Sequence, residues 1–301
     1  YFHNMIGLLT ELAGGPTPEN IALVPDRLIP DNNTPHPVAP QKWHFRQSID
    51  YSISLNYAVL DYAARHSDEL LFNIYRMGKN SIERGSRDNW TYFPKRIQAI
   101  KDAHLKKQPA GTSLTPQAVV PAQLYDSLLA IPEARDPRGY IIPADQRDFP
   151  TAVKFVNTLI RGGIKVEKAT EAFTINAKQY PAGSFIVKTD QAFRPHILDM
   201  FEPQDYPNDF AYPGGPPVAP YDAAGWTLAY QMGVEFDRFQ DDFTGPFEAI
   251  PYGEVQKPQQ SEPAGNGGYL LAVSMNDSFL AVNKLLKAGV EVSRVKNGVN
   301  A

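Results

Sequence analysis

The sequence predicts an α/β fold, and three observations support that prediction. Short apolar segments bounded by glycine and proline are typical of buried strands, and amphipathic segments of helical period alternate with them. Hydrophobic residues make up 43% of the chain and charged residues 21%, which is ordinary for a globular protein with a buried core. The length of 301 residues indicates roughly two domains, at about 100–200 residues each.

The first predicted strand covers residues 4–11. It is short and apolar, it ends at Glu11, and Gly14 and Gly15 follow it. Residues 14–44 are rich in proline and asparagine, so we expect an irregular crossing there without secondary structure of its own.

Residues 46–79 predict a long helix. Apolar side chains fall at helical spacing at Ile49, Ile53, Tyr57, Leu60 and Ala64. The run His66-Ser67-Asp68 predicts an interruption of this helix, and Gly78 predicts its end. A shorter helix is expected at residues 94–107, and residues 108–137 are expected to be mostly connector.

The next segment has the pattern of a β-α-β unit. Strands are predicted at residues 140–142, 164–166 and 184–187, and an amphipathic helix at 149–161. Because strands alternate with helices here, the pattern predicts a parallel sheet. A short helix at residues 223–233 follows a stretch rich in proline and glycine.

The same pattern recurs near the C-terminus. Residues 268–271 resemble residues 139–142, and residues 289–292 resemble residues 163–166. Two explanations remain open, because a true internal repeat and the convergence of a common β-α-β start both produce this similarity.

These patterns divide the chain into five expected segments. They are the C-terminal part of a first domain at 1–90, a connector at 91–110, a parallel-sheet α/β domain at 111–245, a linker at 246–266 and the start of a further, truncated α/β unit at 267–301. The chain begins without methionine or a signal peptide, and both ends look cut. We therefore expect a fragment of a longer protein.

Composition and motifs exclude several classes of function. The net charge of −4 and the pI near 5.9 give no basic surface for nucleic acid. The absence of cysteine excludes disulfides, thiolate metal sites and a cysteine nucleophile. No apolar run approaches the ~20 residues of a membrane span. We also find no phosphate-binding loop, no dinucleotide-binding glycine motif and no nucleophile elbow.

The start of the chain, YFHNMIGLLTELAGGPTP, carries the most informative pattern. It resembles the region around the catalytic glutamate of the carboxypeptidase A-like zinc metallopeptidases, especially their large bacterial multidomain branch. The resemblance continues through residues 40–51 and 75–79 and covers roughly the first 90 residues. It implies that residues 1–90 complete a mixed-sheet peptidase domain. It also implies that α/β domains follow, some of them glutamine amidotransferase-like but here without the cysteine that such a catalyst needs.

The resemblance places Thr10 and Glu11 on the strand that ends at the catalytic glutamate. It implies that Glu11 is the general base, which takes a proton from zinc-bound water and returns it to the leaving amine. The residue pattern by itself allows another interpretation, a strand-end glutamate in a salt bridge. His3 matches no ligand position of the family, so we expect a polar or structural role for it.

Zinc in this family is held by His-x-x-Glu and a distant histidine, all upstream of the catalytic glutamate. The resemblance therefore implies zinc in the full-length parent, with ligands outside this chain, and no metal in this chain alone. One decoy exists, because His66 and Glu69 form a His-x-x-Glu with His196 downstream. The pair lies in a helical segment rather than after a strand, so a solvated helix face explains it better.

Two further groups of residues have ordinary explanations. Asp241, Asp242 and Glu248 lack the spacing of a calcium loop and read as a solvated acidic patch. An aromatic stretch interleaved with prolines fits either a ligand groove or the packing of a loop. It contains Phe201, Tyr206, Phe210, Tyr212, Tyr221 and Trp226.

The leading hypothesis is that the parent protein hydrolyses C-terminal peptide bonds, with peptide or protein C-termini as substrates. By itself this chain is expected to be inactive. The alternative is a non-catalytic binding or scaffolding module next to a peptidase-like domain that has lost its metal. A third hypothesis, an independent α/β ligand-binding protein, requires that residues 1–90 fold without an upstream half. The resemblance favours export from a bacterium, to the periplasm or outside.

Overall fold

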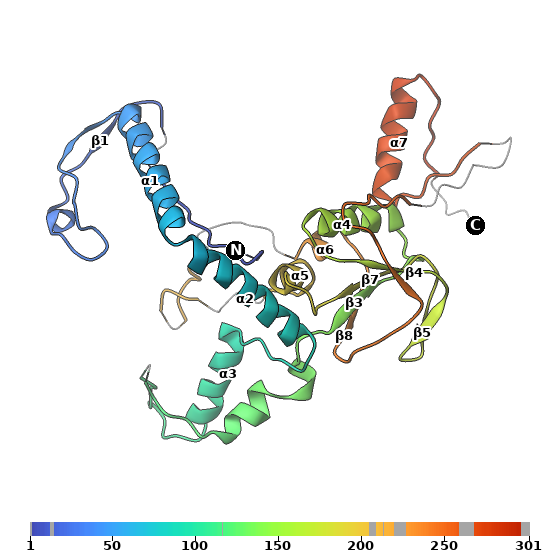
Figure 1. The fold of residues 1–301 in the computed structure, drawn as a ribbon, viewed down its shortest axis with the longest axis horizontal. Coiled ribbons are helices and arrows are strands. Elements are labelled where there is room, and N and C mark those ends of the chain that lie inside the picture. The colour runs from blue at the N-terminus through green and yellow to red at the C-terminus, as the bar shows by residue number, and fades with distance from the viewer. Residues whose placement is uncertain are drawn as a thin grey trace. The chain divides into compact units, whose positions relative to one another are not determined.

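The computed structural model describes residues 2–12, 15–115, 117–204, 209–212, 214–219, 227–258 and 268–295. The chain divides into two units, His3–Arg76 and Met77–Ala301. Figure 1 labels their helices and strands. Helices accompany an antiparallel sheet, so the protein is broadly α/β, as predicted.

The first unit contains a strand pair. Strand β1 (Glu19–Ile21) pairs antiparallel with β2 (Gln41–Trp43), and a 3₁₀ turn lies between them at Pro25–Leu28. The expectation that residues 14–44 hold no secondary structure is therefore wrong. Each strand has only three residues, which is too short for a periodic pattern to reveal.

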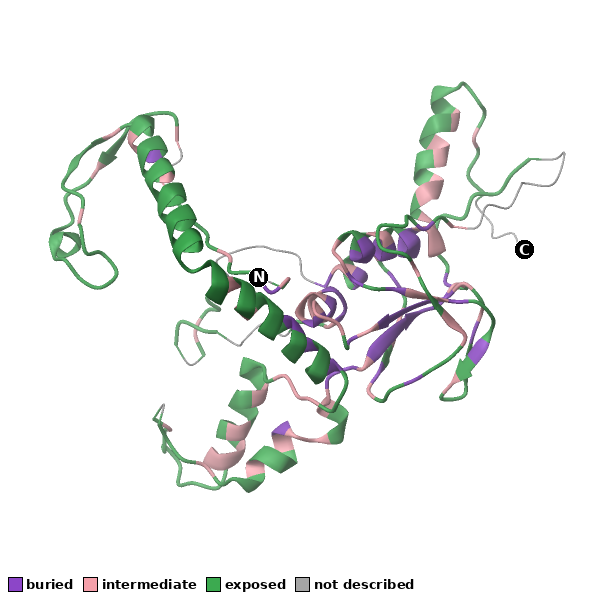
Figure 2. Ribbon diagram, viewed as in Figure 1, coloured by how far each residue is buried: buried purple, intermediate pink, exposed green. Residues whose placement is uncertain are grey.

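The long helix and its interruption are confirmed. Helix α1 (Phe45–Arg65) begins at a capping box, in which the His44 backbone N–H donates to Gln47 Oε1 at 2.9 Å. It ends at His66, and α2 (Ser67–Gly85) follows at once. The predicted end at Gly78 is wrong, because Gly78 is buried inside α2, which continues to Gly85. The apolar positions of α1 stay largely exposed, with Tyr57 70% and Leu60 63% exposed. Most of this helix is accordingly drawn as exposed in Figure 2.

The second unit holds the core, on a five-stranded sheet. Its strands are β3 (Gly139–Ile142), β4 (Glu167–Ala169), β7 (Phe185–Lys188), β8 (Asp237–Phe239) and β9 (Phe247–Ala249). The order across the sheet is β8-β3-β7-β4-β9, and every neighbouring pair is antiparallel. A separate hairpin of β5 (Phe173–Ile175) and β6 (Lys178–Tyr180) connects β4 to β7.

The helices of this unit agree well with the sequence pattern. They are α3 (Pro94–Leu105), α4 (Phe149–Arg161), α5 (Arg194–Phe201), α6 (Leu228–Gln231) and α7 (Asn276–Lys287). The predicted helices at 94–107 and 149–161 are confirmed. The predicted helix at 223–233 contains α6, while its residues 223–226 lie outside the described residues. The connector at 108–137 also holds a π-helical turn and a 3₁₀ turn.

The prediction of a parallel sheet is wrong. Strands β3 and β4 do run parallel, as a β-α-β connection requires, but β7 lies between them and is antiparallel to both. Likewise β7 and β8 run parallel and β3 separates them. Two split β-α-β halves therefore interleave, which is the ferredoxin-like arrangement with β9 added at one edge. Sequence periodicity shows a crossover but does not show which strand enters between its two ends.

Side chains from both faces of the sheet are buried. Tyr140, Ile142 and Phe185 pack beneath α4, α5 and α6, which lie along one face (Figure 1). Ile141 and Ile186 point to the opposite face, where the β5–β6 hairpin covers them. Because both faces are covered, β3 reads as a continuous apolar run. Figure 2 shows that buried residues concentrate in this sheet and in α4.

Three boundaries differ from the predictions. The strand expected at 164–166 starts instead at Glu167, and Ile164 and Val166 are buried in the connection before it. The linker predicted at 246–266 is wrong in its first part, because β9 lies there, and residues 259–267 are outside the described residues. Of the further α/β unit, the structure has α7, but residues 268–272 form no strand.

Candidate functional site

The segment that leads to Glu11 differs from the prediction. Residues 5–11 form no strand, so the predicted strand at 4–11 is wrong. The side chains of Met5, Ile6, Leu8 and Leu9 are exposed, and Leu9 reaches 76%. The sequence pattern identified an apolar segment correctly, but no described residue of the chain pairs with it as a strand. Its apolar surface therefore faces solvent.

Glu11 lies at the exposed end of this segment. Gly15 is half-buried nearby in the chain, while Gly14 lies outside the described residues. His3 is half-buried in a turn at the start of the chain, consistent with the polar or structural role expected for it. The enclosure expected around Glu11, at the end of a buried strand, is not formed by the described residues.

His66 and Glu69 lie together at the junction of α1 and α2. The His66 Nδ1 atom is 3.5 Å from Glu69 Oε2, and the two side chains are 43% and 69% exposed. The His66 ring also stacks on Tyr62, with ring centroids 4.4 Å apart. The pair is thus an exposed helix-junction contact, in agreement with the solvated face that the sequence favoured.

His196 occupies a different environment, in α5 of the second unit. A Cβ atom placed on Gly162 would lie 3.0 Å from His196 Nε2, so the imidazole packs closely on the end of α4. A side chain at position 162 would therefore press on the His196 imidazole. His196 belongs to one unit and the His66–Glu69 pair to the other.

The described residues do not form a zinc site. No group of three or more histidine, aspartate or glutamate side chains in this part of the chain is arranged to hold a metal ion. Structural and catalytic zinc sites need at least three protein ligands. His66 and Glu69 supply two, and they are exposed, so the residues present do not fit zinc.

The acidic residues near the end of the sheet are paired with cations. Asp241 lies 3.0 Å from Arg135, and Asp242 Oδ1 accepts a hydrogen bond from Lys188 Nζ at 2.8 Å. The hydrogen bond and charge of Lys188 hold the pKa of Asp242 below its ordinary value. These partners are about 50 residues or more away in sequence, so no local pattern revealed them.

The members of the aromatic stretch have separate environments. Phe201 is fully buried and stacks on Tyr140, with centroids 4.1 Å apart. Phe210 and Tyr212 are exposed by 49% and 63%. The remaining members, Tyr206, Tyr221 and Trp226, lie outside the described residues. Packing thus accounts for Phe201, and the described residues of the stretch form no continuous groove.

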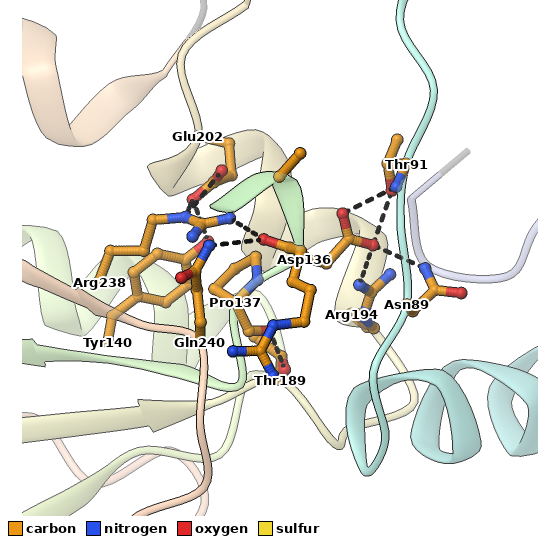
Figure 3. Close-up of polar contacts among 12 residues, drawn as sticks. Asn89, Thr91, Asp136, Pro137, Tyr140, Thr189, Arg194, Glu202, Arg238 and Gln240 are labelled. Atoms are coloured by element: carbon orange, nitrogen blue, oxygen red, sulfur yellow. Dashed lines mark hydrogen bonds and ion pairs between the residues drawn. The ribbon is translucent and has the colours of Figure 1, made fainter. Parts of the chain in front are cut away.

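A buried polar cluster, which sequence analysis missed, centres on Asp136 (Figure 3). Its carboxylate accepts hydrogen bonds from Asn89 Nδ2 at 2.6 Å, from the Thr91 amide and hydroxyl at 2.9 Å, and from Arg194 Nη2 at 2.7 Å. The side chains of Arg194 and Asp136 are only 6% and 10% exposed. This Asp136 cluster ties the loop after α2 to α5 and to the start of β3. Its members are 45 to 58 residues from Asp136, so no spacing signal exists.

A second polar group joins β3, α5 and β8 at Glu202 (Figure 3). Tyr140 Oη donates to Glu202 Oε1 at 2.8 Å, and Arg238 Nε donates to the same carboxylate at 3.0 Å. Burial, together with the nearby Glu202 charge, raises the pKa of Tyr140 well above its ordinary value. Tyr140 is therefore held neutral as a hydrogen-bond donor inside the core.

The second unit also carries an open groove of about 840 Å³. It runs along β4 and β9, and its apolar wall includes Ile164, Val166 and Phe243. Lys188 lies on its rim, where its ammonium group is 3.6 Å from the centroid of the Phe243 ring. Apolar and charged residues thus line an open groove on the surface of the second unit.

We found no matching protein-family model, no matching curated protein and no matching solved structure for this chain. The resemblance of the first 90 residues to the carboxypeptidase A-like family therefore stays a prediction. In the described part of the chain, no helix is long and apolar enough to cross a membrane.

Proposed function

We propose that this chain is part of a zinc metallocarboxypeptidase-like protein that removes C-terminal residues from peptides, with Glu11 as the general base. One observation supports the proposal beyond the sequence pattern. The residues before Glu11 expose contiguous apolar side chains, and Ile6, Leu8 and Leu9 are each more than 60% exposed. Contiguous apolar surface of this kind marks a contact with further protein.

In this proposal the chain contributes one catalytic group and no metal ligand. Glu11 accepts a proton from the attacking water and passes it to the leaving amine. In this proposal, as the resemblance implies, the zinc of the parent protein is held by residues outside this chain. The 301-residue chain by itself then has no peptidase activity. Export from a bacterium, with peptide or protein C-termini as substrates, completes the proposal.

The test uses the parent protein expressed from its complete reading frame, with zinc present. Release of the C-terminal amino acid from a peptide is measured for the wild type, Glu11→Gln and Glu19→Gln. Glu19 is a matched control, because it is an exposed glutamate in β1 of the same unit. Loss of a general base lowers the rate by about 10²–10⁴-fold. We expect that loss for Glu11→Gln and none for Glu19→Gln, with unchanged circular dichroism for both.

Two results would overturn the proposal. One is full activity of Glu11→Gln, which removes the assignment of Glu11. The other is a parent protein that releases no C-terminal residue with zinc present, which removes the peptidase function itself.

The non-catalytic alternative is favoured by the groove along β4 and β9. A module that binds peptides without hydrolysing them needs such a surface and no catalytic glutamate. Equilibrium binding of the same peptide to the parent protein separates the two proposals. Saturable binding without any product supports a binding module, and product formation that depends on Glu11 supports the peptidase.

A further inference from the structure

Gly163, the second of the two glycines after α4, begins a motif that occurs three times in the chain. Residues 163–169 read GIKVEKA, residues 233–239 read GVEFDRF and residues 289–295 read GVEVSRV. In each copy the glycine has a positive φ, of 81°, 66° and 74° in that order. Each glycine ends a helix in the left-handed conformation that favours glycine.

The hydrogen bonds of the three helix ends also agree. The amide after each glycine donates to the carbonyl five residues back, from Ile164 to Leu159 at 3.0 Å, from Val234 to Ala229 at 2.9 Å and from Val290 to Leu285 at 3.0 Å. In the first two copies the motif runs on into β4 and β8. These are the closing strands of the two interleaved β-α-β halves, so the motif marks the end of a half.

In the domain built on the five-stranded sheet, which we call the completed domain, each β-α-β half also contacts the glycine motif of the other half through a glutamine side chain. Gln191 follows β7 and bonds to both backbone groups of Lys165, at 2.7 Å to its N–H and 2.9 Å to its carbonyl. Gln146 follows β3 and bonds in the same way to Glu235, at 3.1 and 3.3 Å. Lys165 and Glu235 are the third residues of their motifs. We call these two contacts the glutamine clamps.

The sequence around each clamp is shared as well. Asp145-Gln146 follows β3 and Asp190-Gln191 follows β7, each at the start of a crossover. Each clamp glutamine also donates a hydrogen bond to the end of the strand that precedes it. Gln146 donates to the Pro143 carbonyl after β3, and Gln191 donates to the Lys188 carbonyl at the end of β7, both at 2.8 Å. A complete domain therefore consists of two halves that exchange strands and clamps.

Residues 268–295, which we call the third half, repeat this pattern, and no described residue supplies them with a complement. Residues 268–271 read GYLL and correspond to GYII of β3. Yet Tyr269 and Leu270 are 67% and 69% exposed, whereas Tyr140 and Ile141 of β3 are fully buried. Neither 268–272 nor 290–295 forms a strand.

The helix of the third half is nevertheless held in place. The Asn276 amide donates to Asp148 Oδ2 at 3.0 Å, while Asp148 Oδ1 caps α4 through the Thr151 amide at 3.3 Å. One carboxylate thus serves the N-termini of both α4 and α7. The apolar side of α7 stays open, and Leu286 is 56% exposed where the corresponding Ile160 of α4 is 3% exposed.

We propose that the third half is completed by a complementary half of the parent protein, which inserts an apolar strand of the β7 type between residues 268–271 and residues 293–295. In the completed domain β7 pairs antiparallel with β3 and β4 at once. The inserted strand repeats both pairings and is followed by Asp-Gln. Its glutamine clamps Glu291, the third residue of the third motif. This inference does not depend on Glu11.

The chemistry of the open surface explains the choice of occupant. Residues 268–272 and 290–295 have no strand partner among the described residues, and an added strand pairs with the backbone N–H and C=O groups of such segments along their length. The side chains of residues 269–271 are aromatic and aliphatic, as in β3, which β7 covers with Phe185, Ile186 and Val187. A small polar ligand would satisfy neither requirement.

The test adds a peptide to the whole 301-residue chain. The peptide carries residues 183–192, GSFIVKTDQA, which contain β7 and its clamp glutamine. Hydrogen exchange of the amides at 268–272 and 290–295 is measured by mass spectrometry. At a peptide concentration about ten times its dissociation constant, exchange of these amides slows by about tenfold. A peptide with alanine in place of the glutamine binds about fivefold more weakly, because it cannot form the clamp.

Two variants of the chain localise the effect. Leu270→Asp is expected to abolish the slowing, because Leu270 corresponds to Ile141, and its charge would be buried on the sheet face beside the peptide's Ile186. Val119→Asp is the matched control and is expected to change nothing, since Val119 is 91% exposed in the connector before β3. Both positions are exposed, so neither change disturbs the core of the completed domain.

Three outcomes would overturn the proposal. The first is unchanged exchange at every soluble peptide concentration. The second is equal slowing by the alanine peptide or by a scrambled peptide, which would show that the clamp glutamine does not contribute to binding. The third is slowing without peptide that grows with protein concentration, which identifies a second copy of this chain as the occupant. The readout is exchange rather than hydrolysis, so its failure is distinct from failure of the peptidase proposal.

Discussion

Gln191 holds Lys165 by both polar groups of its backbone, although the two residues lie 26 positions apart. A third bond runs from Gln191 Nε2 to the Lys188 carbonyl at 2.8 Å. The side-chain amide of Gln191 thus forms hydrogen bonds of the kind that a neighbouring strand would form, and these bonds link the end of β7 to the residues just before β4. It connects the end of β7 in one half of the sheet to the backbone just before β4 in the other.

We expect Gln191→Ala to destabilise the second unit by about 0.5–1.5 kcal/mol, because its hydrogen bonds to the backbone of Lys165 and Lys188 are lost and water replaces them at the exposed Lys165. Gln98→Ala is the matched control, since Gln98 bonds to Asp102 within the exposed face of α3. It should cost about 0.5 kcal/mol or less. Urea unfolding followed by tyrosine and tryptophan fluorescence measures both, and equal costs would show that the clamp contributes nothing.

We expect Arg194→Met to be more severe. Removal of one partner of a buried ion pair leaves the other charge uncompensated, at about 3–5 kcal/mol. Arg46→Met tests the same change in the exposed pair with Asp50, whose side chains are 78% and 53% exposed, and should cost far less than Arg194→Met, because solvent screens the exposed charges. Unfolding free energies of both variants are compared, and a cost for Arg194→Met no larger than for Arg46→Met would contradict a stabilising Asp136 cluster.

The Lys188–Asp242 contact should be sensitive to acid. The hydrogen bond from Lys188 lowers the pKa of Asp242 below the ordinary value of 3.8. Because the folded pKa is the lower one, the contact stabilises the fold above pH 3.8 and is lost as the pH falls through the folded pKa. Both groups are near the surface, so the contribution to stability is small.

Lys188→Met is therefore expected to raise the pKa of Asp242 towards 3.8. Carboxyl carbon chemical shifts followed between pH 2 and pH 6, a range of about two units on either side, give the midpoint directly. Lys178→Met is the control, because Lys178 pairs with Asp237 at 2.6 Å instead. An unchanged Asp242 midpoint in Lys188→Met would show that another group sets this pKa.

We expect the isolated chain to retain no stoichiometric zinc after dialysis. The exposed His66 and Glu69 side chains supply two ligands, fewer than zinc sites in proteins need. Metal analysis of the wild type and of His66→Ala tests this. One zinc ion per wild-type chain that His66→Ala removes would make the decoy a real site and would require ligands that the structure does not bring together.

Several elements were predictable because their signals are local. The helices at 46–79 and 94–107, the interruption at His66 and the helix at 149–161 follow from apolar spacing and from glycine, which act over a few residues. The strand at 139–142 was found for the same reason, since both faces of it are buried and its apolar run is continuous.

The candidate site was less predictable. Local sequence patterns indicated Glu11 and the His66–Glu69 pair, but no pattern indicated the Asp136 cluster or the glutamine clamps. Those groups join residues separated by 26 to 89 positions, where no spacing rule operates. They are recognisable only after the fold has brought their strands and loops together.

The sequence by itself determined where the chain is helical, which segments are apolar and which chemistries it lacks, because propensity, periodicity and composition are properties of neighbouring residues. Only the tertiary structure decided that β7 enters between β3 and β4, which makes the sheet antiparallel. It also decided that the core lies in residues 139–250 while the apolar segment before Glu11 stays exposed. The physical reason is that strand pairing and burial depend on which distant segments compete for the same backbone and apolar surface, and that competition is settled in three dimensions.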